Sequence, residues 1–267
     1  MNNRIHKILN TCRKTNRKAL SIFITAGFPG IDATPSIVKT LEKAGADIIE
    51  LGIPFSDPLA DGPTIQHSSD SAIKNGVTIT TVFDIVAKIR RDSDIPIVLM
   101  GYVNPVMAYG MEKFMKTAAT KGVDGLIVPD IPVEESGEYR EFALHNNLAP
   151  IFLAAPTSSD ERLKQIDAAS EGFVYCVSLT GVTGKTNGLS DNVSGYLKRC
   201  KKCITHNPIL VGFGISSGKD AHDLAPHADG IIVGSALIKR IQNQRNGDYY
   251  PEINAFVRDL REGLDNN

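Results

Sequence analysis

The residues best placed to do chemistry lie in one short segment, residues 50–63, which contains three carboxylates and three prolines. Glu50 lies near the end of a strand-like run, where alternation turns it away from its two apolar neighbours. The prolines fix their own φ angles and push the preceding residues out of the helical region, so Asp57 and Asp61 are expected on a restrained loop. Both aspartates can also be explained as turn or helix caps. Glu50 resists that explanation, and burial would raise its pKa toward neutrality, as a general acid or base requires.

Tyr175 is a second polar candidate on a strand-like run. It shares a face with Phe173 and Val177, so its hydroxyl is expected in the same interior as Glu50. A role as an ordinary core aromatic is equally compatible with the sequence.

Two glycine-rich loops in the last part of the chain indicate an anion site. Residues 212–218 read Gly-Phe-Gly-Ile-Ser-Ser-Gly, and Gly234-Ser235 opens a predicted helix. Glycines let backbone N–H groups approach an anion, and the positive end of a helix adds attraction. The alternative is that each glycine only permits a positive φ at a tight turn. Because both loops belong to adjacent units, we expect a phosphorylated small molecule.

Three other motifs do not qualify as cofactor or metal sites. Gly184-Lys185-Thr186 resembles the tail of a P-loop, but Leu179 stands where that motif needs its first glycine. The run from Gly212 to Gly218 has no glycine at the third position of a dinucleotide fingerprint. Cys200-x-x-Cys203 with His206 has a metal-like spacing but no convincing fourth ligand nearby. We therefore expect no ATP, NAD or metal site.

These candidates need a scaffold, and the chain alternates strand-like runs with segments of helical periodicity. Such alternation predicts a parallel sheet with helices outside it. Eight units fit a single (β/α)8 TIM barrel over residues 1–267 better than an open doubly wound sheet. The predicted strands are Leu20–Ala26, Asp47–Gly52, Ile95–Gly101, Gly125–Pro129, Pro150–Ala154, Phe173–Val177, Ile209–Gly212 and Gly230–Val233.

An amphipathic helix is expected ahead of the barrel, at about residues 3–15, because Ile5, Ile8, Leu9 and Cys12 have helical spacing. The barrel itself is expected over about residues 18–265. Its first strand follows the helix almost at once, which argues against a cleavable transit peptide.

A weak internal repeat marks one end of this barrel. Gly-Ala-Asp47, Gly-Val-Asp124 and Ala-Asp229-Gly each precede or open a predicted strand. In (β/α)8 barrels the end where strands begin serves stability, and function collects where strands finish. The candidate residues above fall at the second end.

Composition restricts the class of protein. With 42% hydrophobic residues, 22% charged residues and a formal net charge of −1, the chain is typical of a globular protein and shows no sign of nucleic-acid binding. The longest apolar runs fall far short of the roughly 20 residues that a membrane helix needs. Four cysteines do not make a disulfide framework. We expect a cytoplasmic protein that binds neither nucleic acid nor membrane.

The segment after Asp47 also carries a family resemblance. Residues 50–66 closely resemble the signature of the tryptophan synthase alpha chain family. Further blocks follow in the family's order and extend the resemblance over about residues 18–243, which makes it specific. These blocks are Met100–Pro105, Val128–Glu135, Ala149–Phe152, Ser178–Gly184, Gly212–Ile215 and Gly234–Ala236.

The resemblance implies a carbon–carbon lyase of tryptophan biosynthesis that cleaves indole-3-glycerol phosphate to indole and glyceraldehyde 3-phosphate by a retro-aldol reaction. Glu50 would protonate indole C3 and remove the proton of the neighbouring side-chain hydroxyl. Asp61 would accept a hydrogen bond from the indole N–H and stabilise the positive charge that develops on the ring. Tyr175 would assist near the carboxylates. The family's phosphate-binding positions correspond to Gly184, Gly214, Ile215, Gly234 and Ser235.

The indole ring needs an apolar pocket, which we expect near the strand ends. Its candidate residues are Phe23, Leu99, Met100, Ile127 and Leu153.

The resemblance also implies a partner. The family's beta chain carries pyridoxal phosphate and joins indole to serine in an alpha2beta2 heterotetramer, so this chain itself is expected to hold no cofactor. Asp57, Pro58 and Thr183 match segments that communicate with the beta chain. The polar, glycine-containing loop from Leu179 to Asp191 is expected to be a mobile lid.

Two other functions stay open at this point. The first is a catalytically idle barrel subunit that only regulates the beta chain; the presence of Glu50, Asp61 and Tyr175 favours the lyase. The second is another phosphate-binding barrel, such as indole-3-glycerol phosphate synthase or an isomerase. The synthase is expected to use a lysine at a strand end, and no lysine lies on the predicted strands.

Overall fold

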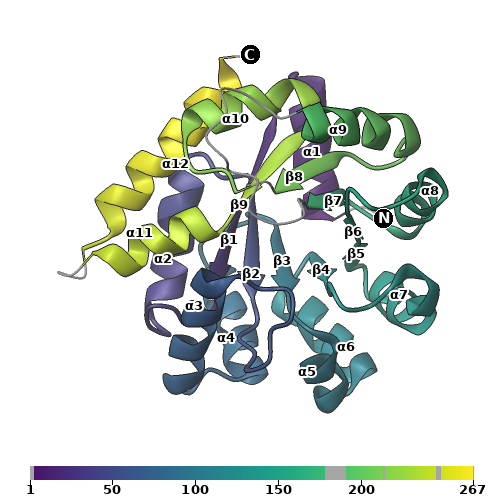
Figure 1. The fold of residues 1–267 in the computed structure, drawn as a ribbon. Coiled ribbons are helices and arrows are strands. Elements are labelled where there is room, and N and C mark those ends of the chain that lie inside the picture. The colour runs from purple at the N-terminus through teal and green to yellow at the C-terminus, as the bar shows by residue number, and fades with distance from the viewer. Residues whose placement is uncertain (1–2, 178–190, 213, 245–247, 267) are drawn as a thin grey trace.

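The computed structural model describes residues 3–177, 191–212, 214–244 and 248–266. Within these ranges, parallel strands form the wall of a barrel and helices surround it (Figure 1). The hydrogen-bonded order of the strands is β5-β4-β3-β2-β1-β9-β8-β7-β6. The predicted (β/α)8 architecture with an additional N-terminal helix is confirmed.

The strands lie close to their predicted positions. Their bounds are β1 Ala19–Thr25, β2 Ile48–Gly52, β3 Ile97–Met100, β4 Gly125–Ile127, β5 Ala149–Ile151, β6 Leu153–Ala154, β7 Val174–Val177, β8 Ile209–Gly212 and β9 Gly230–Val233. The α-helices are α1 Arg4–Lys14, α2 Ala33–Ala44, α3 Pro63–Lys74, α4 Ile79–Ile89, α5 Val103–Tyr109, α6 Met111–Lys121, α7 Gly137–His145, α8 Asp160–Ala169, α9 Asp191–Cys203, α10 Gly218–Leu224, α11 Ser235–Asn243 and α12 Tyr250–Asp265. Two short 3₁₀ helices are η1 Val133–Glu135 and η2 Ala225–His227.

The fifth predicted strand is interrupted at Phe152, which separates β5 from β6. The N–H of Phe152 is bonded to the Ser170 hydroxyl at 3.3 Å, whereas its carbonyl accepts from the N–H of Tyr175 at 3.1 Å. β5 pairs with β4, and β6 pairs with β7. The two short segments therefore act together as one strand that closes the barrel.

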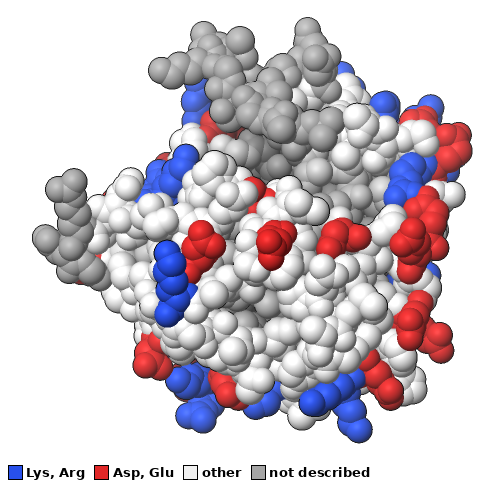
Figure 2. All heavy atoms as spheres, turned by 60° about the horizontal axis from the view of Figure 1, so that its bottom comes forward, with Lys and Arg blue, Asp and Glu red and all other residues white. Residues whose placement is uncertain are grey.

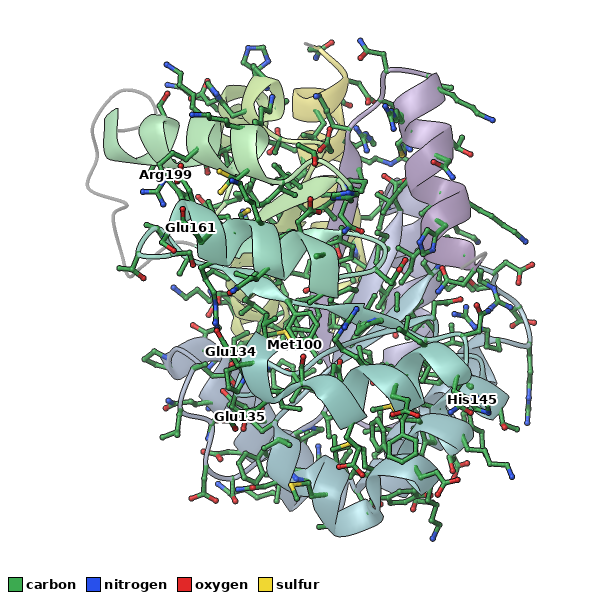
Figure 3. The ribbon with its side chains drawn as sticks, turned by 90° about the vertical axis from the view of Figure 1, so that its right-hand side faces the viewer. Met100, Glu134, Glu135, His145, Glu161 and Arg199 are labelled. Atoms are coloured by element: carbon green, nitrogen blue, oxygen red, sulfur yellow. The ribbon has the colours of Figure 1, made fainter. Side chains whose placement is uncertain are left out.

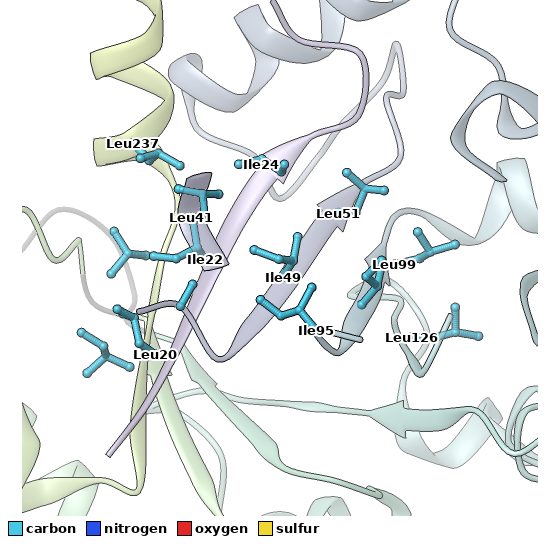
Figure 4. Packing of buried hydrophobic residues seen from close by; sticks show 14 of the residues in the cluster. Leu20, Ile22, Ile24, Leu41, Ile49, Leu51, Ile95, Leu99, Leu126 and Leu237 are labelled. Atoms are coloured by element: carbon cyan, nitrogen blue, oxygen red, sulfur yellow. The ribbon is translucent and has the colours of Figure 1, made fainter. Parts of the chain in front are cut away.

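Apolar side chains form two separate clusters, one on each face of the barrel wall. The outer cluster lies between strands and helices and includes Ile49, Leu51, Leu99 and Leu126 (Figure 4). The inner cluster fills the barrel, because side chains along each strand alternate between its two faces. Its members are Ile5, Leu9, Cys12, Ala19, Ile48, Val98, Ile127, Ala149, Ile151, Phe173, Leu210 and Ile232.

Helix α1 packs against the strands from the end where they begin. Ile5, Leu9 and Cys12 are buried and belong to the inner cluster, which confirms the predicted apolar face of this helix. Asn3 caps the helix by accepting the N–H of His6. In the described part of the chain, no helix is long and apolar enough to cross a membrane.

The repeated aspartates stabilise this same end of the barrel. One carboxylate oxygen of each accepts the N–H of a residue at the start of the neighbouring strand. Asp47 accepts from Leu20 at 2.9 Å, Asp124 from Ile97 at 2.9 Å, and Asp229 from Ile209 at 2.8 Å. The repeat is therefore a structural device that satisfies N–H groups at the starts of β1, β3 and β8.

Candidate active site

Glu50 lies inside the barrel near the carboxyl end of β2. Its side chain is fully buried, on the face of the strand opposite Ile49 and Leu51, as alternation predicts. Oε1 accepts a hydrogen bond of 2.8 Å from the hydroxyl of Ser21 on β1. Oε2 is buried and has no hydrogen-bond partner among the residues that the structure describes. Burial raises the pKa of Glu50 to about 7, although the Ser21 hydrogen bond opposes the rise.

Tyr175 points into the same interior from β7. It packs against the inner cluster, to which Phe173, just before β7, belongs. A Cβ atom at Gly212 would lie 2.7 Å from the Tyr175 hydroxyl oxygen, so a glycine at this position of β8 leaves room for that hydroxyl. Burial raises the pKa of Tyr175, and the carboxylates of Glu50 and Asp61 raise it further. Both predicted catalytic carboxylates are therefore close enough to Tyr175 to affect its hydroxyl.

Asp61 reaches the site from the loop between β2 and α3. Its side chain is partly buried, and burial raises its pKa while a hydrogen bond from Tyr102 lowers it. The Tyr102 oxygen also accepts the N–H of Ala60 at 2.9 Å. Burial, with a smaller contribution from Asp61, raises the pKa of Tyr102 to about 12, so this group keeps its proton. Tyr102 thus holds the loop that carries Asp61 against the barrel.

Four of the five residues predicted for the indole pocket face the interior. Met100, Ile127 and Leu153 are part of the inner cluster or pack against it, and Met100 is seen among the strands in Figure 3. The ring of Phe23 on β1 lies against Gly52 and Gly234.

The expectation for Leu99 is wrong. Leu99 belongs to the outer cluster, next to Leu126, and is covered by helices (Figure 4). Neighbouring residues of a strand point to opposite faces, so Leu99 and Met100 cannot both line the interior.

The two glycine-rich loops follow β8 and β9, which are neighbouring strands. Gly214 has φ +65°, a left-handed conformation that favours glycine. Gly234 is the N-cap of α11, and as a glycine it offers no side chain to cap this helix. The first N–H groups of a helix have no partner within it, so those of Ser235 and Ala236 face the loop region. The side chain of Ile215 is buried in the outer cluster, which leaves its main chain for an anion.

Some predicted residues fall elsewhere. The structure does not describe Thr183, Gly184 or the predicted lid from Leu179 up to the start of α9. Asp57 is exposed and Pro58 partly exposed, both on the loop that carries Asp61. A cavity of about 770 Å³ lies at the other end of the barrel, beside α1, and its lining contains none of the predicted site residues.

Ser21 and Tyr102 were missed by the sequence analysis. Position gives a signal for each: Ser21 is a polar residue between apolar neighbours on β1, and Tyr102 follows the carboxyl end of β3. Their contacts with Glu50 and Asp61 depend on neighbouring strands, which a local pattern does not reveal.

A closed parallel barrel with a buried carboxyl group of raised pKa near the carboxyl ends of its strands defines the chain as a (β/α)8-barrel enzyme of the acid–base type. The family model for the tryptophan synthase alpha chain matches residues 9–263. The chain belongs to this family.

Tryptophan synthase alpha chains from other organisms are similar to this chain over nearly its full length. The tryptophan synthase alpha chain of Caldanaerobacter subterraneus subsp. tengcongensis is 49% identical over 263 residues, which cover 98% of this chain and 100% of the relative. That of Geotalea daltonii is 43% identical and covers 98% of both chains. A crystal structure of the alpha chain from Legionella pneumophila superposes with a TM-score of 0.92 at 35% identity, covering 100% of this chain and 98% of that one.

The family assigns the reaction. The chain is an alpha subunit of tryptophan synthase, a lyase that cleaves indole-3-glycerol phosphate in tryptophan biosynthesis. The alpha chain family uses no cofactor, and pyridoxal phosphate belongs to the beta chain.

Proposed function

We propose that Glu50 is the group that moves both protons in the cleavage of indole-3-glycerol phosphate. The observation that carries this proposal is the state of its carboxyl group, which is fully buried, has one oxygen without a partner in the described ranges of the chain, and has a pKa raised to about 7. At neutral pH both protonation states of such a group are populated, so one residue serves as acid and then as base.

The reaction balances with this single group. Protonated Glu50 gives its proton to indole C3, and the ring nitrogen takes up the positive charge. The resulting carboxylate then accepts the proton of the side-chain hydroxyl on the adjacent carbon. That carbon becomes the aldehyde of glyceraldehyde 3-phosphate as the carbon–carbon bond breaks, and the bonding electrons neutralise the ring. Indole leaves, and Glu50 is protonated again.

Asp61 and Tyr175 are proposed to support this transfer. A carboxylate at Asp61 would accept the indole N–H and stabilise the charge on the ring. Tyr175, whose pKa both carboxylates raise, keeps its proton and can donate a hydrogen bond beside them. The main chain of Gly214, Ile215, Gly234 and Ser235, together with Gly184, is proposed to hold the phosphate.

Indole release from indole-3-glycerol phosphate tests this function. The purified chain should form indole alone or when the beta chain is added. Absence of indole under both conditions would contradict the lyase and favour the idle subunit that only regulates its partner.

We also propose an alpha2beta2 assembly with the beta chain, through the loop that carries Asp57 and Pro58, together with Thr183. On the same loop, Leu59 is 95% exposed, more than any of the other large apolar side chains named as exposed in the described residues. Figure 2 brings forward the helices at the bottom of Figure 1 and shows mostly uncharged surface at its centre, with separate acidic side chains across it. An apolar side chain of this kind is suited to burial against a partner.

The predicted cytoplasmic location is supported by the four cysteines, which are all buried free thiols. Cell fractionation checks it, and recovery of the chain from an extracellular fraction would contradict it.

A further inference from the structure

We propose that Ser21 is a positioning residue for the lyase reaction: its hydroxyl holds Oε1 of Glu50 and leaves Oε2 as the oxygen that exchanges protons with the substrate. The inference rests on the proposed role of Glu50 and adds the group that orients it.

The contact is well defined by the fold. β1 lies between β2 and β9 in the barrel wall, and Ser21 is paired with Ile48, two residues before Glu50. The Ser21 hydroxyl therefore reaches Oε1 across neighbouring strands, at 2.8 Å. Both side chains are fully buried, so water does not compete for this bond.

No other polar contact fixes the carboxyl group among the described residues. Ser21 is the one group that offsets the effect of burial on Glu50. Among the other titratable groups, Tyr175 on β7 has its pKa raised by burial and further by Glu50 and by Asp61 on the loop after β2. Within the described part of the chain the buried Oε2 atom has no partner, so the two oxygens of Glu50 differ in their surroundings there.

A serine suits a carboxyl group that changes its protonation state. Its hydroxyl is both a donor and an acceptor, so it can stay paired with the carboxylate and with the carboxylic acid. It also lowers the pKa of Glu50 relative to burial alone, which keeps both forms available near neutral pH.

Ser21→Ala tests the proposal by two readouts. The first is the titration of Glu50, followed by ¹³C NMR of the chain labelled at glutamate carboxyl carbons, with the resonance assigned by its absence in Glu50→Gln. Loss of the donor destabilises the carboxylate, so the midpoint should rise by about one pH unit. The second is steady-state indole release in the complex with the beta chain. The value of kcat should fall by about tenfold while KM changes less than about twofold, because Ser21 does not touch the substrate.

Two further variants separate the possible causes. Ser21→Thr keeps the hydroxyl and should restore both the midpoint and kcat. Ser170→Ala removes another buried hydroxyl, one that bonds the N–H of Phe152, and should leave the Glu50 midpoint unchanged.

An unchanged midpoint or an unchanged kcat in Ser21→Ala would overturn the proposal. If Glu50→Gln abolishes indole release while Ser21→Ala has no effect, only the role of Ser21 fails. If Glu50→Gln retains indole release, the proposed function of Glu50 fails, whereas the NMR midpoint still reports on the Ser21 contact.

Discussion

Glu50 is held in a state that favours reactivity over stability. Burial removes water from its carboxyl group and raises its pKa. The hydrogen bond from Ser21 lowers the pKa by a smaller amount, and no basic side chain is among the causes of the shift. The neutral form is therefore favoured up to about pH 7, against an ordinary value of 4.5. Such a shift has a thermodynamic consequence, because the folded chain binds this proton more tightly than the unfolded chain does.

We predict that Glu50→Gln changes the pH dependence of stability. From pH 4 to pH 8, Glu50 loses its proton earlier in the unfolded chain than in the folded chain. The free energy of unfolding of the wild type should therefore fall with rising pH relative to the variant, by about 3 kcal/mol over this range. Urea denaturation of both proteins at several pH values measures this difference. A difference that does not change with pH would contradict the raised pKa.

The alternation of side chains along a strand correctly predicts which residues point inward when only one residue of that strand is assigned to the site. Glu50 was placed correctly because its apolar neighbours define the other face of β2. The prediction for Leu99 is wrong because Leu99 and Met100 are consecutive residues of one strand. Only one of the two side chains can point into the barrel. Ser21 was missed because its importance comes from a neighbouring strand and not from its own.

Among the elements, the strand starts depend on buried aspartates. Asp124 has a side chain only 2% exposed and lies 2.7 Å from Nη2 of Arg90. The same oxygen accepts the N–H of Ile97, so one carboxylate joins the start of β3 to the end of α4. Arg4 in α1 contacts the other oxygen at 3.2 Å. This network links α1, α4 and β3 at the end of the barrel opposite the catalytic site.

We predict that Asp124→Asn lowers the free energy of unfolding by about 3 kcal/mol, because Arg90 loses its buried partner. Asp94→Asn is the matched control: Asp94 pairs with Arg4 at 3.1 Å, but its side chain is 94% exposed. Solvent screens such a pair, so this control should have little effect. Chemical denaturation measures both variants. Equal stability of Asp124→Asn and the wild type would show that the network contributes nothing.

The sequence allows helices and strands to be told apart, but it predicts less accurately where each helix or strand begins and ends. The repeated Asp47, Asp124 and Asp229 were correctly assigned to the stability end, although their bonds to neighbouring strands could not be foreseen from the chain. The break at Phe152 was missed for the same reason, because its N–H is satisfied by Ser170 from another element.

The two ends of the barrel have different roles, one in stability and the other in catalysis and partner binding. One end carries α1, the aspartate network and the strand starts. The other carries Glu50, Asp61, the two glycine-rich loops and the exposed loop at Leu59. Figure 3 shows the same division from the side, with Glu134 and Glu135 far from His145 across the molecule.

We predict that Leu59→Ser weakens association with the beta chain by about tenfold, because burial of a leucine side chain contributes about 1.5 kcal/mol or more. Leu144→Ser is the control, since Leu144 is 38% exposed and precedes His145 near the other end of the barrel. Isothermal titration calorimetry measures both affinities. The proposed interface would be wrong if Leu59→Ser bound as tightly as the wild type, or if both variants lost affinity equally.

The central claim is that Glu50 moves the protons, and indole release by Glu50→Gln in the presence of the beta chain tests it most directly. Glutamine keeps the size of the side chain but neither gives nor takes a proton at neutral pH. Removal of a general acid or base typically lowers the rate by roughly 10² to 10⁴. We predict a loss of this size with unchanged binding of the beta chain, and indole release within a few-fold of the wild type would contradict the role of Glu50.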